Sequence, residues 1–126
     1  MRLGVHTSIA GGLHKSLERA RELGCNTMQI FSGSPRVWAA KKRSAEEVDS
    51  FRKLRTEYDI APVFIHTSYL INLATADPGL RQKSIDMVLR EMKAADEMGA
   101  EYVVLHTGSA SGDDPKTARA RAISCL

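Results

Sequence analysis

Three of the four histidines in this sequence end short apolar runs, and each of them is followed by threonine. They are His6, His66 and His106. Short apolar runs of this kind are typical of buried strands in a parallel sheet. Side chains at the carboxyl ends of such strands lie at the edge where α/β proteins perform their chemistry. Because neutral imidazole is a good zinc ligand, the pattern predicts a site at this edge.

His66 and His106 are the strongest candidates, because they end consecutive strands along the chain. Neighbouring parallel strands lie about 4.8 Å apart, so two imidazoles at their ends reach one ion at Zn–N distances of about 2.0–2.1 Å. We therefore expect both side chains to be metal ligands; the alternative is that they are hydrogen-bonded histidines at strand ends. His6 and Ser8 are expected at the same rim, where they would orient or contact a ligand.

Two predicted loops at this rim carry side chains that suit nucleic acid. Arg36 follows the second strand, in a basic loop that also holds Trp38 and residues 41–43. Tyr69 and Leu70 follow the third strand. Cationic side chains neutralise phosphates, and aromatic or aliphatic side chains on loop tips can wedge between bases. The alternatives are a solvated charged surface and aromatic packing over a helix.

The elements that must position these residues form a βαβαβαβα pattern. Strand-to-strand spacing is roughly 25 to 40 residues, close to the average of about 31 in a (β/α)₈ barrel of about 250 residues. The fold class is therefore α/β, with TIM-barrel-type repeats and parallel strands. About four of the eight units are present, as a half or truncated barrel; a small doubly wound α/β domain is the alternative. The strands are expected at residues 3–6, 27–31, 62–66 and 102–106.

Local signals mark the helices. Ser44 and Glu47 form a capping box, and both Asp77 and Asp114 stand before a proline, as N-cap residues do. Gly24 and Gly99 are expected to follow the first and third helices. Apolar residues at helical spacing predict the buried faces: Leu13, Leu17, Ala20 and Leu23 in the first helix, and Leu80, Ile85, Val88, Met92 and Ala95 in the third.

Composition sets broad limits. The chain has 126 residues, 43% hydrophobic and 26% charged, with a net charge of +3, which excludes a disordered chain. It has no apolar run of the roughly 20 residues needed to span a bilayer, so no membrane partner is expected. Cys25 and Cys125 are far apart and are expected as free thiols in the cytoplasm.

Four segments, taken together, resemble the endonuclease IV family of apurinic/apyrimidinic endonucleases. They are residues 4–12, 36–38, 66–73 and 106–109. The resemblance covers essentially the whole chain but only the N-terminal half of a family member, so 1–126 would be the N-terminal half of an endonuclease IV-like, xylose-isomerase-like TIM barrel. It implies a trinuclear zinc site at the C-terminal rim. It also implies DNA repair in the base excision pathway, by hydrolysis of the phosphodiester 5′ to an abasic site.

By this resemblance, His66 and His106 are ligands of one zinc. Arg36, Tyr69 and Leu70 would penetrate double-stranded DNA and stabilise a flipped-out abasic nucleotide, whereas His6 receives no ligand role. The family's remaining Glu, Asp and His ligands belong to later strands that this sequence lacks. We therefore expect the 126-residue chain to have little or no nuclease activity and a full-length parent to be active.

Two other functions remain open. A sugar isomerase-like or epimerase-like barrel would share the fold and a metal-binding rim, but no Asp or Glu stands at the four predicted strand ends, where such an enzyme needs carboxylates. The other possibility is a non-catalytic half-barrel that binds DNA or self-associates through its open sheet edges, since unpaired edge strands invite association.

Overall fold

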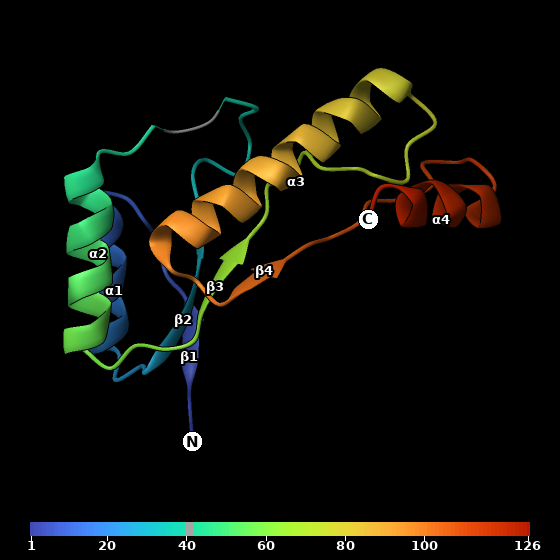
Figure 1. Ribbon diagram of the computed structural model, residues 1–126. Coiled ribbons are helices and arrows are strands. Elements are labelled where there is room, and N and C mark those ends of the chain that lie inside the picture. The colour runs from blue at the N-terminus through green and yellow to red at the C-terminus, as the bar shows by residue number, and fades with distance from the viewer. Residues whose placement is uncertain (40–41) are drawn as a thin grey trace.

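The computed structural model describes residues 1–39 and 42–126; Lys41, in the predicted basic loop, lies outside the described residues. Within these ranges four strands alternate with four helices (Figure 1). The strands are β1 (Gly4–His6), β2 (Thr27–Phe31), β3 (Val63–His66) and β4 (Tyr102–Val104). The helices are α1 (Leu13–Glu22), α2 (Ala45–Glu57), α3 (Pro78–Met98) and α4 (Pro115–Ser124).

All four strands run parallel in one sheet, in the order β1-β2-β3-β4. Strand order therefore follows chain order, as it does around a barrel and not in a doubly wound sheet. The ladder pairs His6 with Gln29 and Phe31 with His66. The predicted fold class, TIM-barrel-type β/α repeats making up about four units, is confirmed.

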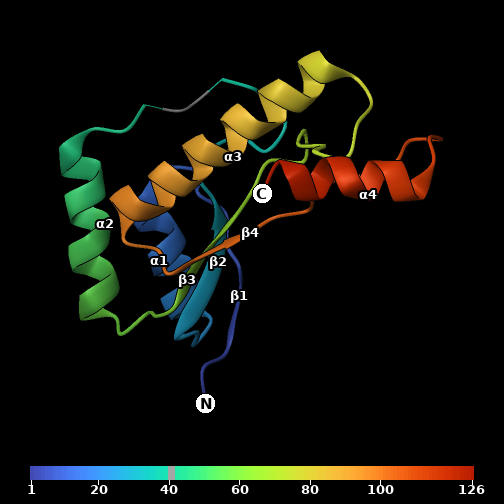
Figure 2. The ribbon, with the colours of Figure 1, turned by 45° about the vertical axis from the view of Figure 1, so that its right-hand side comes forward.

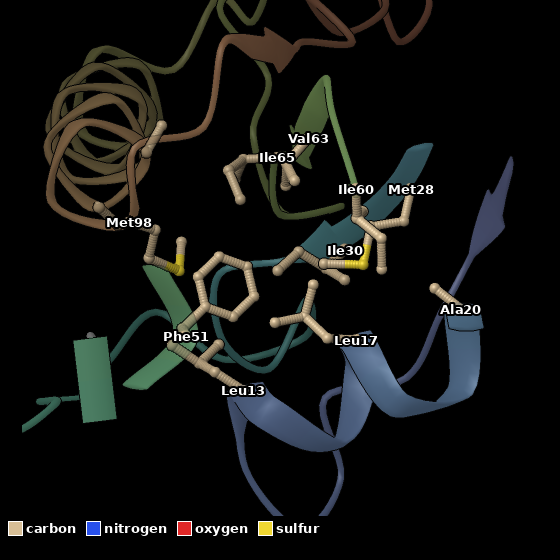
Figure 3. Packing of buried hydrophobic residues seen from close by; sticks show 12 residues of the cluster. Leu13, Leu17, Ala20, Met28, Ile30, Phe51, Ile60, Val63, Ile65 and Met98 are labelled. Carbon is tan, nitrogen blue, oxygen red and sulfur yellow. The ribbon is translucent and has the colours of Figure 1, made fainter. Parts of the chain in front are cut away.

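The main core lies between the sheet and helices α1, α2 and α3, which cover the same side of it (Figures 1 and 2). Alternate residues of β2 and β3 face these helices, because side chains alternate across a strand. The ring of Phe51 lies at the centre of this core, against Leu17, Ile30 and Met98 (Figure 3). Burial of these side chains leaves the intervening residues of β2 and β3 on the opposite face, where the histidines lie.

The predicted helix ends are largely confirmed. Ser44 Oγ accepts a hydrogen bond from the backbone N–H of Glu47 at 3.2 Å, and the Asp77 and Asp114 carboxylates cap α3 and α4. The backbone φ is 71° at Gly24 and 68° at Gly99, in the left-handed region that glycine adopts readily. These caps fix where each helix starts and stops, and so how long each loop at the rim can be.

The prediction that all the strands are buried is wrong for β1 and β4. Val5 is 47% exposed and Tyr102 is 55% exposed, because each strand lies at an edge of the sheet with a neighbour on one side only. Strand β4 also ends at Val104, so His106 follows it by two residues instead of ending it. The loop that carries His106 must therefore hold the imidazole in place.

The predicted apolar faces of α1 and α3 are partly wrong. Leu23 and Met92 are exposed, and the buried face of α3 includes Met87, Met98 and the charged Glu91. The reason is that α3 is 21 residues long and serves two cores. Its C-terminal part packs on the main core and its middle on a second cluster. This cluster includes residues of α4 and contains Ile71, Leu73, Ala74, Met87, Ala118 and Ala122.

No described helix has the length and apolar character needed to cross a membrane.

Candidate metal and nucleic-acid site

The candidate site lies at the carboxyl ends of the strands. His66 is the last residue of β3, and the ladder sets it beside Phe31, the last residue of β2. The two rings meet edge to face with centroids 5.2 Å apart, and the ring of His6 packs against Phe31 with centroids 4.5 Å apart. The regular alternation of β2 and β3 thus places one aromatic cluster on the face of the sheet opposite the core.

His66 and His106 come together, as their predicted strand positions require. Their Nε2 atoms lie 3.2 Å apart, although the ladder pairs His66 with Val104. His66 Nδ1 lies 2.8 Å from the carbonyl oxygen of Thr67. Since a carbonyl only accepts hydrogen bonds, Nδ1 carries the proton and donates it. The Nε2 lone pair of His66 therefore points at the imidazole of His106.

This geometry fits part of a zinc site. Two nitrogens bound to zinc at the usual distance and a tetrahedral angle lie about 3.3 Å apart, close to the 3.2 Å between the two Nε2 atoms. The hydrogen bond from His66 Nδ1 to a backbone carbonyl is the usual outer support of a ligating histidine. Among the described residues, no group of three or more His, Cys, Asp or Glu side chains converges on a single metal position. Within that part of the chain the two imidazoles therefore do not make up a complete metal site, and their role as metal ligands stays a prediction.

His6 lies beside this pair without joining it. Its ring centroid is 5.9 Å from that of His66, and its Nδ1 accepts a hydrogen bond from the Gln29 amide at 2.9 Å. Burial lowers the pKa of His6, and the neighbouring imidazole of His66 lowers it further. Ser8 is exposed nearby, and both residues line a groove that runs toward Phe31 and Pro35. The placement at the rim is as expected, and the suggested contact with a ligand stays a prediction.

The three predicted nucleic-acid contacts surround the histidines. Tyr69 is 61% exposed, and its ring packs on His66 with centroids 5.7 Å apart. Leu70 is half-buried beside it, and Arg36 is exposed on the neighbouring loop. Within residues 1–39 and 42–126 the Arg36 guanidinium has no polar partner, so it is free to meet a phosphate. The structure brings these side chains to one rim, and their contact with DNA stays a prediction.

The two loops that carry these side chains are joined through one backbone atom. The carbonyl oxygen of Pro35 accepts hydrogen bonds from the backbone N–H of Tyr69 at 3.0 Å and from the hydroxyl of Ser68 at 2.8 Å. Arg36, next to Pro35, and Tyr69 are therefore held at a fixed separation. Their relative position comes from this contact and not from the strands alone.

Sequence reasoning missed three residues of the site. Phe31 supports the rings of His6, His66 and Tyr69, and Gln29 fixes the orientation of His6. Both belong to the predicted strand 27–31, whose alternation places them on the face of the histidines, so strand periodicity was a usable signal. The third, Asn72, bonds to the backbone of Ser109 across to the loop of His106, and no local pattern indicated it.

Comparisons with known proteins agree with this arrangement. A family model described as a xylose isomerase-like TIM barrel matches residues 17–126. A protein of Persephonella marina named "Probable endonuclease 4" is 45% identical over 112 residues, which are 89% of this chain and 39% of that protein. The chain thus spans less than half the length of this relative.

Solved structures give the same result. Endonuclease IV from Thermus thermophilus superposes with a TM-score of 0.85 and 38% identity, over 100% of this chain and 46% of that one. A D-psicose 3-epimerase superposes with a TM-score of 0.69 over 98% of this chain and 46% of that one, but at 12% identity, so this likeness concerns the fold alone.

Proposed function

Since this chain belongs to the family of xylose isomerase-like TIM barrels, we propose that it is the N-terminal half of a zinc-dependent DNA-repair endonuclease. The proposed reaction is hydrolysis of the phosphodiester 5′ to an abasic site in double-stranded DNA, within base excision repair. The substrate is a proposal that draws on the names of longer relatives, since the chain covers 39% of the Persephonella marina protein.

One observation carries the proposal. His66 and His106 direct their Nε2 atoms at each other across 3.2 Å, directly beside the exposed ring of Tyr69. Two imidazoles spaced as for a shared metal ion stand next to an exposed aromatic side chain and a free guanidinium. Together they offer two features that phosphodiester cleavage needs. The first is a place for a cation, and the second is a surface for a distorted backbone.

Each side chain has a proposed task. His66 and His106 would hold one zinc ion through their Nε2 atoms, and zinc, when bound, supplies Lewis acidity and a hydroxide near neutral pH. Arg36 neutralises phosphates beside the lesion. Tyr69 and Leu70 fill the gap that an extruded abasic nucleotide leaves in the base stack. His6 and Ser8 line the adjoining groove, where they contact the DNA backbone or orient a bound ligand.

Nuclease activity is proposed for the full-length parent and not for these 126 residues alone. The described residues offer a pair of imidazoles, while clustered cations need further ligands and a bridging carboxylate. We expect little or no cleavage of an abasic duplex by the purified chain with added zinc. Cleavage at the rate of a full-length relative would contradict this expectation.

Binding of abasic DNA is the direct test of the proposed surface. We expect the chain to prefer a duplex with one abasic site over the intact duplex, and the double variant Arg36→Ala/Tyr69→Ala to lose that preference. Loss of the Arg36 charge alone should reduce the slope of log affinity against log salt by about one. The measurement is fluorescence anisotropy of labelled duplexes across a salt series.

A charge-matched control separates local contact from overall charge. Arg119 is exposed on α4, on a different element from the loops of the site, so Arg119→Ala should leave the abasic preference intact. If the double variant keeps its abasic affinity and the full-length protein turns over a sugar, the isomerase-like or epimerase-like function is correct instead. The 12% identity to a D-psicose 3-epimerase gives that function no support beyond the shared fold.

Two further parts of the proposal concern partners and location. Strands β1 and β4 each have a neighbour on one side only, so association of two copies through these open edges is proposed for the isolated chain. A cytoplasmic location is proposed because Cys25 and Cys125 are both free thiols, as in a reducing compartment.

A further inference from the structure

A buried carboxyl group lies behind the two loops of the proposed DNA surface. Glu91, in the middle of α3, is 7% exposed, although the neighbouring positions on the same helix face are Met87, Ala94 and Met98. Burying a carboxylate costs free energy unless it is hydrogen-bonded, so an apolar residue would serve the packing of this helix better. The role proposed above for the rim does not use Glu91.

The carboxyl group of Glu91 lies next to both loops. Its Oε2 accepts a hydrogen bond from the hydroxyl of Ser32, the first residue after β2. Burial raises the pKa of Glu91, whereas the Ser32 hydroxyl, the charge of Arg43, the backbone of Ser68 and the charge of Arg90 lower it. Ser32 begins the loop of Arg36, and Ser68 stands directly before Tyr69. One side chain on α3 therefore touches the starting points of both loops.

The same two loops are also hydrogen-bonded directly to each other. Pro35 accepts hydrogen bonds from the Ser68 hydroxyl and the Tyr69 backbone N–H. Glu91, Ser32, Pro35 and Ser68 therefore lie around one closed circuit of neighbours, in which hydrogen bonds join Ser32 to Glu91 and Ser68 to Pro35. Glu91 is the only one of these four residues that a helix contributes. If Glu91 is removed, Ser32 loses its hydrogen-bond acceptor, and the loops keep their hydrogen bonds at Pro35 and the packing of Trp38.

We infer that Glu91 is a positioning residue, which fixes the loop of Arg36 relative to the loop of Tyr69 and so sets the spacing at which the two side chains meet a distorted DNA backbone. This inference rests on the proposed function. Glu91 acts through Ser32 and Ser68 and touches neither the DNA nor the histidines. It should therefore affect DNA affinity and loop order without affecting zinc binding at His66 and His106.

The test compares Glu91→Ala, Glu91→Gln and Ser32→Ala in the full 126-residue chain. Glu97→Ala is the matched control, because Glu97 is an exposed acidic residue on the same helix. It lines, together with Glu91 and Ser32, a pocket of about 400 Å³. Trp38, the single tryptophan, lies in the loop of Arg36 and packs on the second core cluster. Acrylamide quenching of its fluorescence reports whether that loop is held in place.

We expect Glu91→Ala and Ser32→Ala each to lower the affinity for abasic duplex about tenfold and to increase quenching of Trp38. Helix content by circular dichroism and zinc-induced shifts of the imidazole signals should not change. Glu91→Gln should restore most of the affinity, since its amide oxygen accepts the same hydrogen bonds. Because both alanine variants break one circuit, the double variant should be no weaker than either single variant.

Equal quenching and equal abasic affinity in Glu91→Ala and Glu97→Ala would overturn the inference. If Glu91→Ala does not fold, Ser32→Ala decides the question, and a wild-type response from it would also overturn the inference. Failure of the proposed function looks different. In that case the wild-type chain shows no preference for abasic over intact duplex, while Trp38 quenching still reports whether Glu91 holds the loop.

Discussion

The imidazole of His66 is oriented before any ligand arrives. Its Nδ1 proton is committed to the carbonyl of Thr67, and its ring is enclosed by Phe31 and Tyr69. A side chain held in this way presents a single lone pair in a fixed direction, which removes part of the ordering cost of metal binding. His106 is less constrained, because it is exposed and follows β4 by two residues.

At the level of single residues, we predict that His66 and His106 bind zinc as a pair. Zinc should shift the imidazole signals of His66 and His106 together in a nuclear magnetic resonance titration, because both Nε2 atoms would bind the same ion. His106→Ala should weaken the zinc response of His66 by at least about tenfold, the low end of what loss of a supporting partner alone costs. His14→Ala is the control, since His14 lies on α1 and is not among the rings packed on His66. An unchanged zinc response at His66 in His106→Ala would contradict a shared ion.

The sequence predicted which residues lie at the site better than it predicted what surrounds them. It brought His66 and His106 to one rim because both follow apolar strands, and the structure has them in contact. It did not find Glu91, because a glutamate in a long helix has the same local pattern whether it is solvated or buried. The polar groups beside its carboxylate lie 59 and 23 positions away in the sequence, at Ser32 and Ser68. Only the packing of α3 against the sheet brings them together.

Helices and loops were predicted with uneven success, for a physical reason. Caps such as Ser44 and Asp77 are local, and their hydrogen bonds reach two or three residues along the chain, so sequence alone locates them. The buried face of α3 is not set by local sequence, because different residues of this helix pack on two separate core clusters. A single apolar stripe was therefore the wrong description, and Met92 is 54% exposed.

The loop after β4 depends on one close approach, which leads to a prediction at the scale of elements. Gly108 has a φ of 107°, and a Cβ atom there would lie 2.0 Å from Oδ1 of Asn72. That oxygen accepts hydrogen bonds from the backbone of Ala74 and Ser109, so it cannot move without releasing both. Gly108→Ala should therefore destabilise the fold by about 1–3 kcal/mol, measured by urea unfolding.

A substitution at a second glycine distinguishes the cost of a steric clash from the cost of backbone strain. Gly112 has a φ of 91°, and a Cβ atom there would meet nothing within 4 Å. Gly112→Ala therefore carries only the cost of the left-handed backbone, and it should be less destabilising than Gly108→Ala. Equal effects of the two substitutions would mean that the contact with Asn72 does not hold the loop.

At the scale of the whole molecule, the sheet has one covered face and one open face. The helices cover the side of Met28 and Ile65, while Phe64 and Tyr102 stack on each other on the other side, with ring centroids 5.0 Å apart. In a closed barrel the second face is filled by layers of side chains from all the strands. The repeat spacing predicted this architecture and, with it, open edges at the first and last strands, which the order β1-β2-β3-β4 confirms.

For the whole molecule, we predict self-association through the open edges of the sheet. Light scattering should detect a dimer fraction that grows with concentration, because β1 and β4 each present unpaired backbone groups. Val5→Lys should reduce it, since Val5 is 47% exposed on the edge strand β1. Leu89→Lys, at a 59% exposed position on α3, is the control and should have no effect. A monomer at all concentrations would contradict association through the edges.

The contact at Pro35 has a consequence for how this chain tolerates change. The atom that joins the two rim loops is a main-chain oxygen, so exchanging one side chain for another at this position leaves it present. Substitution scans would therefore record position 35 as permissive. A one-residue insertion or deletion between Ser32 and Arg36 moves that oxygen away from both of its donors, and selection should act there on loop length more strongly than on residue identity.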